Sequence, residues 1–133
     1  MPASPVNEDP DALDAVQVLL QQGEVAKALE TLNGLADTAQ SSAMGQYMRG
    51  VCLRLTRDFA NAESALRQLV DSNPSYGRGF QELGHLYRDA NMPIEALNAY
   101  ATACHLNPGL KASWAAQRDL IGKSSPERTA QIN

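Results

Sequence analysis

The sequence has few aromatic residues and no long apolar run. Only seven of its 133 residues are Phe, Trp or Tyr, so the core has to be built mainly from Leu, Ala and Val. Leu and Ala are strong helix formers, whereas the β-branched residues that favour strands are scarce, which predicts an all-α fold. No apolar segment approaches the roughly 18 residues that a membrane-spanning helix needs.

The sequence also has fewer basic than acidic residues. It contains 15 Asp and Glu against 11 Lys and Arg, which gives a formal net charge of −4. That balance disfavours a nucleic-acid backbone as the main partner. The first ten residues, MPASPVNEDP, contain no basic region followed by an apolar run, and they do not have the pattern of a secretory signal. A cytoplasmic location is the expectation that follows.

The residues that carry most enzyme chemistry are few and scattered. Cys52 and Cys104 fall within apolar helical patterns, so we expect buried free thiols rather than a disulfide. Neither has a histidine placed to act as a base, and no cysteine or carboxylate lies at metal-ligand spacing beside His85 or His105. The glycines occur singly, without a phosphate-binding loop. We therefore predict no catalytic residue, no metal site and no cofactor.

What the sequence does contain is a period of 34 residues. One step of 34 takes Gly84 to Gly50, and two steps take Ala96 to Ala62 and then to Ala28. Further pairs in this register are Asn107-Pro108 with Asn73-Pro74, Leu66 with Leu32, Leu69 with Leu35, and Leu53 with Leu19. No insertion or deletion interrupts the three copies, and a fixed period near 34 is typical of stacked helical repeats.

Each copy contains start and stop signals for two helices. In the third copy, Ser75 is expected to cap a helix that ends near residue 90, and Asn91 to form the turn. Pro93 then stands in the first turn of a helix that ends at Asn107-Pro108. The other expected helices cover about 42–56 and 59–71 in the second copy; in the first copy, one runs from Asp9-Pro10 to a turn at Gly23 and one covers about 24–38.

Small residues recur where the two helices of a pair should meet. Gly84 and Ala96 are expected on facing sides of one pair, where the two backbones approach closely. A large side chain at either position would force the helices apart at a cost of about 1–3 kcal/mol. Because one such pair leaves an apolar face uncovered, each pair has to stack on the next.

This pattern resembles the tetratricopeptide repeat (TPR) family. The third copy carries the family's motif as Phe80, Leu83-Gly84, Tyr87, Asn91, Ala96, Tyr100, Ala103 and Pro108. The resemblance implies a right-handed solenoid of antiparallel helix pairs with about seven helices. The implied segments are an N-terminal tail at 1–8, repeats at 9–42, 43–76 and 77–110, a capping helix at 111–121 that contains Trp114 as a packing residue, and a C-terminal tail at 122–133.

Four residues depart from the family's pattern. Val16 stands where glycine is usual, and Gln40 stands where proline is usual. In the second repeat, Gln46 and Arg49 replace an aromatic residue and a leucine. Terminal repeats are often atypical, which accounts for the first two departures. Arg49 is expected to reach towards solvent from a partly buried position.

The resemblance also implies a concave surface, lined by the first helix of each repeat, that binds an extended peptide. Carried over by position, the groove residues are Leu13, Gln17, Leu20 and Gln21, then Tyr47, Val51, Arg54 and Leu55, then Arg78, Gln81, His85, Arg88 and Asp89. The spacing of the last five residues places them on one helix face.

Three arginines among these residues suggest a ligand with an acidic group. Arg54, Arg78 and Arg88 can pair with a carboxylate, including a free C-terminus, through forked hydrogen bonds. The alternative is a solvated helix face with ordinary charges. Some TPR proteins hold chaperone C-termini with a five-residue clamp; here the matching positions are Leu13, Gln17, Met48, Arg78 and Glu82, of which only Arg78 fits. A chaperone partner of that kind is not expected.

Three functions are consistent with these features. The first is a non-catalytic interaction module that binds a protein or peptide, without nucleic-acid or membrane binding. The second is the N-terminal repeat region, or a stand-alone relative, of a larger bacterial enzyme, because residues 66–120 are similar to repeat arrays ahead of sulfotransferase domains. The third is self-association into a homo-oligomer through the groove or the ends of the array.

Overall fold

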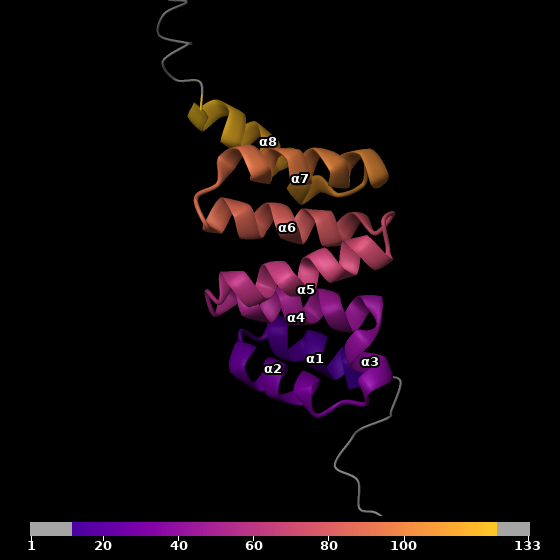
Figure 1. Ribbon diagram of the computed structural model, residues 1–133. Helices are drawn as coiled ribbons and strands as arrows, with labels where there is room; N and C mark the ends of the chain where they lie inside the picture. Colours follow the sequence, from indigo (N-terminus) through magenta and orange to yellow (C-terminus); the bar gives the residue numbers. More distant parts are fainter. Residues whose placement is uncertain (1–11, 125–133) are drawn as a thin grey trace, which may run out of the picture. The chain divides into compact units, whose positions relative to one another are not determined.

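The computed structural model describes residues 12–124, and its regular elements there are eight α-helices (Figure 1). They are α1 (Ala12–Gln21), α2 (Val25–Asn33), α3 (Asp37–Ser41), α4 (Ala43–Leu55), α5 (Phe59–Ser72), α6 (Gly77–Asp89), α7 (Pro93–Leu106) and α8 (Lys111–Ser124). The all-α prediction is confirmed, and α3 is the helix that the sequence did not anticipate. The tail at 1–8, the start signal at Asp9-Pro10 and most of the tail at 122–133 lie outside the described residues.

The chain divides into two compact units, Met1–Asn73 and Pro74–Asn133. The first unit contains α1 to α5, and the second contains α6 to α8. Within the units, α1 packs with α2, α4 with α5, and α6 with α7, each pair joined by a short turn (Figure 1). No helix among residues 12–124 is long and apolar enough to cross a membrane.

The turn inside each helix pair has the same backbone geometry. Gly23, Arg57 and Asn91 are 34 residues apart and have φ values of 79°, 64° and 62°. Glycine adopts this left-handed region freely and asparagine tolerates it, whereas the conformation costs an arginine roughly 1 kcal/mol. The Arg57 guanidinium lies 4.8 Å from the centre of the Phe59 ring, a cation–π contact that offsets part of this cost.

The repeated glycines lie where a helix of each pair meets its partner. A Cβ atom built on Gly84 would lie 2.6 Å from the Tyr100 ring of α7, and one built on Gly50 would collide with the Leu66 side chain of α5. Ala96, which is expected opposite Gly84, is fully buried on α7. Because these glycines have no side chain, Leu66 can pack against Gly50 and Tyr100 can pack against Gly84. Each of these large residues lies 16 positions after its glycine.

The first pair departs from the expected helix over 24–38. Helix α2 ends at Asn33, and Gly34 follows as its C-cap. The Gln40 side chain then donates hydrogen bonds from Nε2 to the carbonyl oxygens of Asn33 and Leu35, at 3.1 and 2.7 Å. These bonds satisfy carbonyl groups that the helix end leaves without partners, so the break is stabilised by a side chain from α3.

The start of α4 agrees with the sequence prediction, whereas the start of α6 does not. Ser42 caps α4, because its hydroxyl oxygen accepts a 3.0 Å hydrogen bond from the Gly45 N–H. The predicted cap at Ser75 is wrong: α6 begins at Gly77, and the N-cap is Tyr76 without a side-chain hydrogen bond. A Cβ atom on Gly77 would approach Asn107 and Leu110 at 3.2 and 3.3 Å, which shows how closely this start packs against the chain after α7.

Helix α8 spans Lys111–Ser124, and it therefore extends three residues beyond the bound at 121 that was predicted for the capping helix. It packs on α7 and α6 through Ser113, Ala116 and Leu120. The packing role predicted for Trp114 is only partly met, because this side chain is 48% exposed. Its indole N–H donates a 2.9 Å hydrogen bond to the Pro108 carbonyl and so ties the start of α8 to the preceding turn.

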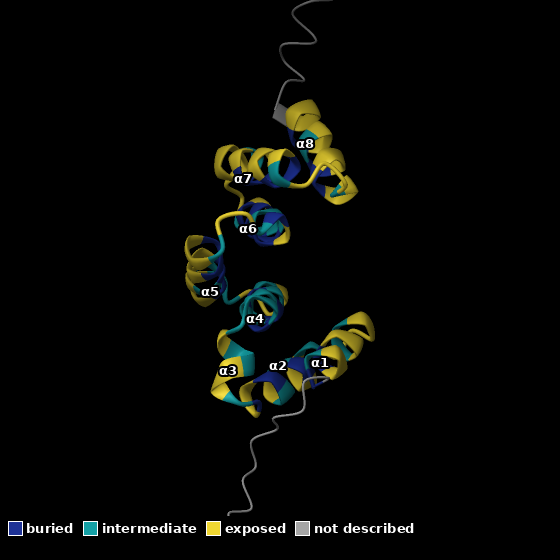
Figure 2. Cartoon of the chain, turned by 90° about the vertical axis from the view of Figure 1, so that its right-hand side faces the viewer, coloured by how far each residue is buried: buried dark blue, intermediate teal, exposed yellow. Residues whose placement is uncertain are grey.

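Each unit buries its own apolar residues on the inner sides of its helices (Figure 2). The core of the first unit includes Val16, Ala28, Leu32, Leu35, Met48 and Cys52. Buried residues of the second unit include Leu83, Tyr87, Ala96, Tyr100, Ala103 and Cys104. On α7 the exposed residues lie on the side away from α6, which is the pattern of a helix covered on one face.

Candidate peptide-binding surface

The five residues predicted on α6 differ in exposure. Arg78 and Arg88 are exposed, whereas Gln81, His85 and Asp89 are half-buried. At the start of the helix, burial raises the pKa of the Tyr76 hydroxyl, and the positive charge of Arg78 acts in the opposite direction. Both ends of this face therefore carry a solvent-accessible cation, and the middle is partly covered.

Gln81 takes part in the contact between α6 and α8. Its Oε1 accepts a 2.7 Å hydrogen bond from the hydroxyl of Ser113, which is fully buried. One turn further along α8, Gln117 donates from Nε2 to the Cys104 sulfur of α7 at 3.1 Å. Because these bonds fix α8 to both neighbouring helices, Gln81 supports the framework of this surface.

His85 is joined to the second helix of its own pair. Its Nδ1 and the Tyr100 hydroxyl oxygen are 2.6 Å apart, a hydrogen bond whose donor depends on the imidazole tautomer. The two rings also meet edge to face, with centroids 5.3 Å apart and an interplanar angle of 69°. Tyr100 is fully buried against Gly84, so the same contact that closes the helix pair also orients His85.

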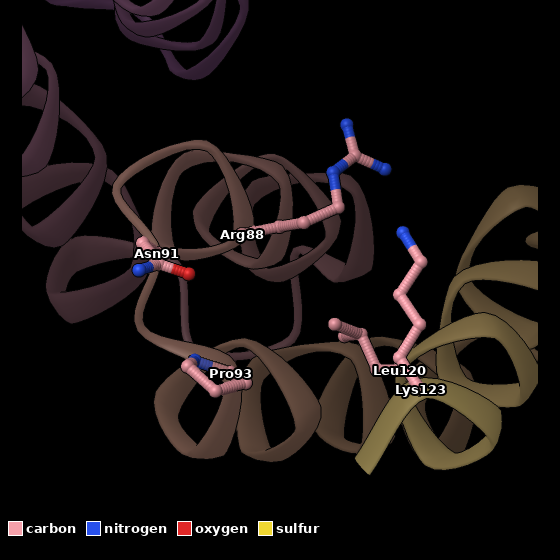
Figure 3. A pocket seen from close by; sticks show the side chains of 5 residues that line it. All are labelled: Arg88, Asn91, Pro93, Leu120 and Lys123. Carbon is pink, nitrogen blue, oxygen red and sulfur yellow. The ribbon is translucent and has the colours of Figure 1, made fainter. Parts of the chain in front are cut away.

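Arg88 lines a pocket of about 260 Å³ in the second unit, together with Asn91, Pro93, Leu120 and Lys123 (Figure 3). Lys123 extends from the last turn of α8 with its amino group on the same side as the Arg88 guanidinium, and Leu120 lies between the bases of the two side chains (Figure 3). Arg88 makes a 3.5 Å ion pair with Asp89, in which 42% of the arginine side chain is exposed. Two cations over an apolar wall suit a carboxylate attached to an aliphatic group.

The predicted groove residues of the first unit are distributed between core and surface. Leu13, Leu20 and Tyr47 are half-buried and pack against the core cluster of that unit. Leu55 is 47% exposed and Gln17 is exposed. Val51 and Arg54 are half-buried, and Gln21 is exposed.

Two of the five positions that the resemblance implies for a carboxylate clamp are buried in the structure. Met48 and Glu82 occupy two of its five positions and are only 2% and 3% exposed. A ligand cannot reach either side chain without disrupting the packing of its helix. Arg78 is the exposed cation at a matching position.

Sequence reasoning missed the contribution of Lys123 and Leu120 to this surface. Both lie on α8, and Lys123 falls after residue 121, where the predicted cap ends. The available signal was Lys123 three residues after Leu120, a spacing that places the two side chains on one face of a helix.

The two cysteines are buried free thiols, as expected. Burial raises the pKa of Cys52 to about 11, and the nearby Arg49 charge lowers it only in part. Burial also raises the pKa of Cys104, against the hydrogen bond from Gln117. Among residues 12–124, no three His, Cys, Asp or Glu side chains are grouped so that they can hold a metal ion.

No family model matches the sequence. No curated protein matches it either. Similarity appears at the level of solved structures. The first TPR of Spaghetti (RPAP3) bound to HSP90 peptide SRMEEVD is 17% identical, with a TM-score of 0.74, over 90% of this chain and 97% of that chain. The NMR structure of the first TPR domain of the human RPAP3 protein is 18% identical, with a TM-score of 0.77, over 90% of this chain and 94% of that chain.

A third similar structure is the MamA RS-1 ArsTM double mutant, which is 19% identical with a TM-score of 0.69, over 93% of this chain and 70% of that chain. At these identities the likeness concerns the fold. The chain therefore has a TPR-like all-α fold, as its 34-residue period indicates.

Proposed function

We propose that this chain is a non-catalytic protein-interaction module that binds a peptide segment bearing an acidic group. The observation that carries the proposal is the pocket where Arg88 and Lys123 stand over Leu120. A carboxylate can pair with both cations, while an adjoining aliphatic side chain packs against Pro93, the exposed apolar residue of the pocket. Arg78, at the other end of the same helix, is a second cation for an acidic peptide that follows α6.

The first RPAP3 TPR supports the choice of ligand class. Its peptide, SRMEEVD, ends in a strongly acidic sequence, and its fold matches this chain over most of both lengths. The buried Met48 and Glu82 imply that this chain uses other residues for an acidic group. We assign that role to Arg78, Arg88 and Lys123.

The groove residues predicted in the first unit stay a separate prediction. Gln17, Val51, Arg54 and Leu55 are exposed or half-buried, so a peptide can reach them. Three expectations from the sequence stay predictions. They are a link to a larger enzyme with a sulfotransferase domain, self-association, and a cytoplasmic location.

A binding measurement with one defined peptide tests the proposal. The probe is the fluorescein-labelled heptapeptide SLELELD with a free carboxylate, and its uncharged control is SLQLQLN with a C-terminal amide. The double variant Arg88→Glu and Lys123→Glu is expected to lose at least tenfold in affinity for the acidic probe, because two charge-assisted hydrogen bonds become repulsions.

Lys27→Glu is the matched control, since Lys27 is exposed on α2 in the first unit. It changes the net charge in the same direction as each substitution in the double variant. Equal affinity of the wild type and the double variant would rule out the Arg88 and Lys123 site. Equal affinity for the two peptides would rule out recognition of an acidic group.

A further inference from the structure

Three departures from the repeat pattern converge on one place in the first unit. Gln40, Gln46 and Arg49 stand where the pattern has a proline, an aromatic residue and a leucine. In the structure all three line a single pocket of about 440 Å³ between α3, α4 and α5. The other residues that line this pocket are Asp37, Ser41, Ala65 and Gln68. Polar side chains thus surround a space that the repeat pattern would line with apolar ones.

A second hollow of about 310 Å³ adjoins the first and shares Arg49, Ala65 and Gln68 with it. Its remaining lining residues are Leu53, Asn61 and Ser64. Along α5, the lining residues run from Asn61 to Gln68, a rise of about 10 Å at 1.5 Å per residue. Three residues of an extended chain span that length. We name the two hollows together the α4–α5 trough.

The cation in the middle of the trough has only uncharged partners in the described part of the chain. Arg49 donates from Nη1 to Asn33 Oδ1 at 2.6 Å and from Nη2 to Gln40 Oε1 at 2.7 Å. No carboxylate within residues 12–124 makes an ion pair with it, although Asp37 lines the same pocket. A guanidinium has five N–H donors, so three are left for a ligand, and its charge favours an anion.

One residue that lines the same pocket as Arg49 has a buried acceptor. The Oε1 atom of Gln46 is inaccessible to solvent and accepts no hydrogen bond from the described residues. Buried carbonyl oxygens are almost always paired in folded proteins, so this atom calls for a donor. Because Gln46 lines the pocket, a turn of its amide would bring this oxygen to a peptide N–H in the trough. The other amide and hydroxyl groups of the trough suit peptide N–H and C=O groups equally.

We propose that the α4–α5 trough binds a short extended peptide segment with an acidic side chain. The carboxylate pairs with the donors of Arg49 that the protein leaves unused, and a backbone N–H of the same segment donates to Gln46 Oε1 once the Gln46 amide has turned into the pocket that it lines. Gln68 and Ser64 line the rest of the path along α5. The elongated form of the trough and its neutral amides favour a peptide over a small carboxylate.

This site is separate from the surface described under the proposed function. Arg88 and Lys123 belong to the second unit, whereas every trough residue belongs to the first. On α4 itself, Gln46, Arg49 and Leu53 lie roughly 150° around the helix from the predicted groove residues Tyr47 and Val51, at 100° per residue. A peptide in the trough therefore leaves the predicted groove face of α4 uncovered.

The test is an NMR titration of the ¹⁵N-labelled full chain with the acetylated and amidated pentapeptide GDSEG, compared with GNSQG. The acidic peptide is expected to shift the side-chain amide signals of Gln46 and Gln68. Arg49→Leu is expected to weaken its binding at least tenfold, and GNSQG is expected to bind at least tenfold more weakly than GDSEG. Arg67→Leu, the same substitution on the exposed side of α5, is expected to leave the affinity unchanged.

Arg49→Leu introduces the residue that the repeat pattern prefers, so a folded variant is expected; circular dichroism checks this. Should it not fold, Gln46→Phe fills the pocket with the pattern's aromatic residue, and the same tenfold loss is required. If the folded Arg49→Leu variant binds GDSEG with wild-type affinity, the proposal is overturned. It is also overturned if GDSEG and GNSQG bind equally, or if the NMR shifts are confined to residues 74–124. The Arg88→Glu and Lys123→Glu variant is expected to keep trough binding, which separates this outcome from a failure of the proposed function.

Discussion

The helix pairs α4–α5 and α6–α7 share one register but differ in what fills their contact. In α4–α5, Gly50 faces the aliphatic side chain of Leu66. In α6–α7, Gly84 faces the ring of Tyr100, whose hydroxyl also binds His85. A glycine therefore sets the helix spacing in both pairs, while the facing residue decides whether the contact is purely apolar or also holds a polar side chain.

A second difference lies at the neighbouring position of the repeat. Leu83 on α6 is 4% exposed, whereas Arg49 takes the equivalent position on α4 and lines the α4–α5 trough. The same backbone position is thus closed by an aliphatic residue in one pair and left open around a cation in the other. Binding chemistry can change at such a position without a change in the helix pairing.

Exchanging these two residues gives the largest expected effect. Leu83→Arg places a charge among buried residues and should lower the free energy of unfolding by about 3 kcal/mol or more. Arg49→Leu should cost less, about 1–2 kcal/mol, because it loses the hydrogen bonds to Asn33 and Gln40 but places no charge among buried residues. Urea denaturation followed by circular dichroism measures both. Equal tolerance of the two variants would show that the position is equally open in both pairs.

A smaller effect is expected at the glycine contacts. Gly84→Ala should destabilise the protein by about 1–3 kcal/mol, since its methyl group would meet a Tyr100 ring that the core holds in place. Gly122→Ala is the control, because a Cβ atom there has no neighbour within 4 Å. Alanine in that helix should be neutral or should stabilise by up to about 1 kcal/mol. Thermal unfolding of the two variants compares them, and a neutral Gly84→Ala contradicts the close contact.

The least effect at neutral pH is expected from the two thiols. Burial raises the pKa of Cys52 from its ordinary value of 9.0 to about 11, so the folded state holds this proton more tightly than the unfolded state. The resulting stability is fully present below pH 9 and is lost as the pH rises towards 11. The ¹³Cβ chemical shift of Cys52, in a Cys104→Ala background, should therefore titrate near pH 11. A midpoint near 9 would contradict the burial of Cys52.

The sequence predicted the helices best where their signals are local. Pro93 begins α7 as expected, and the turn residues Gly23 and Asn91 have the left-handed backbone that their types favour. The end of α2 was missed because it depends on Gln40 reaching back to the carbonyl groups of that helix. Ser75 has a capping side chain but does not cap α6, since that helix begins two residues later at Gly77.

The candidate sites were less predictable than the fold. The register predicted Arg78 and Arg88 on one face of α6, and Lys123 lines a pocket with Arg88 only because α8 packs on α6 and α7. Arg49 was recognised as a departure from the repeat pattern. Its hydrogen bond to Gln40 could not be predicted, because Gln40 lies on the unexpected helix α3. Departures from a repeat pattern are therefore useful markers of sites, although their partners have to come from the structure.

The sequence by itself determined the period of 34, the pairing of helices and the glycines at their contacts. Helix geometry is local, so the spacing of small and large residues along the chain is enough to specify which faces meet. Only the tertiary structure decided which polar residues are engaged and which face open space. Gln81 binds Ser113 and His85 binds Tyr100 across distances of 32 and 15 residues in the chain, and no local pattern encodes such bonds.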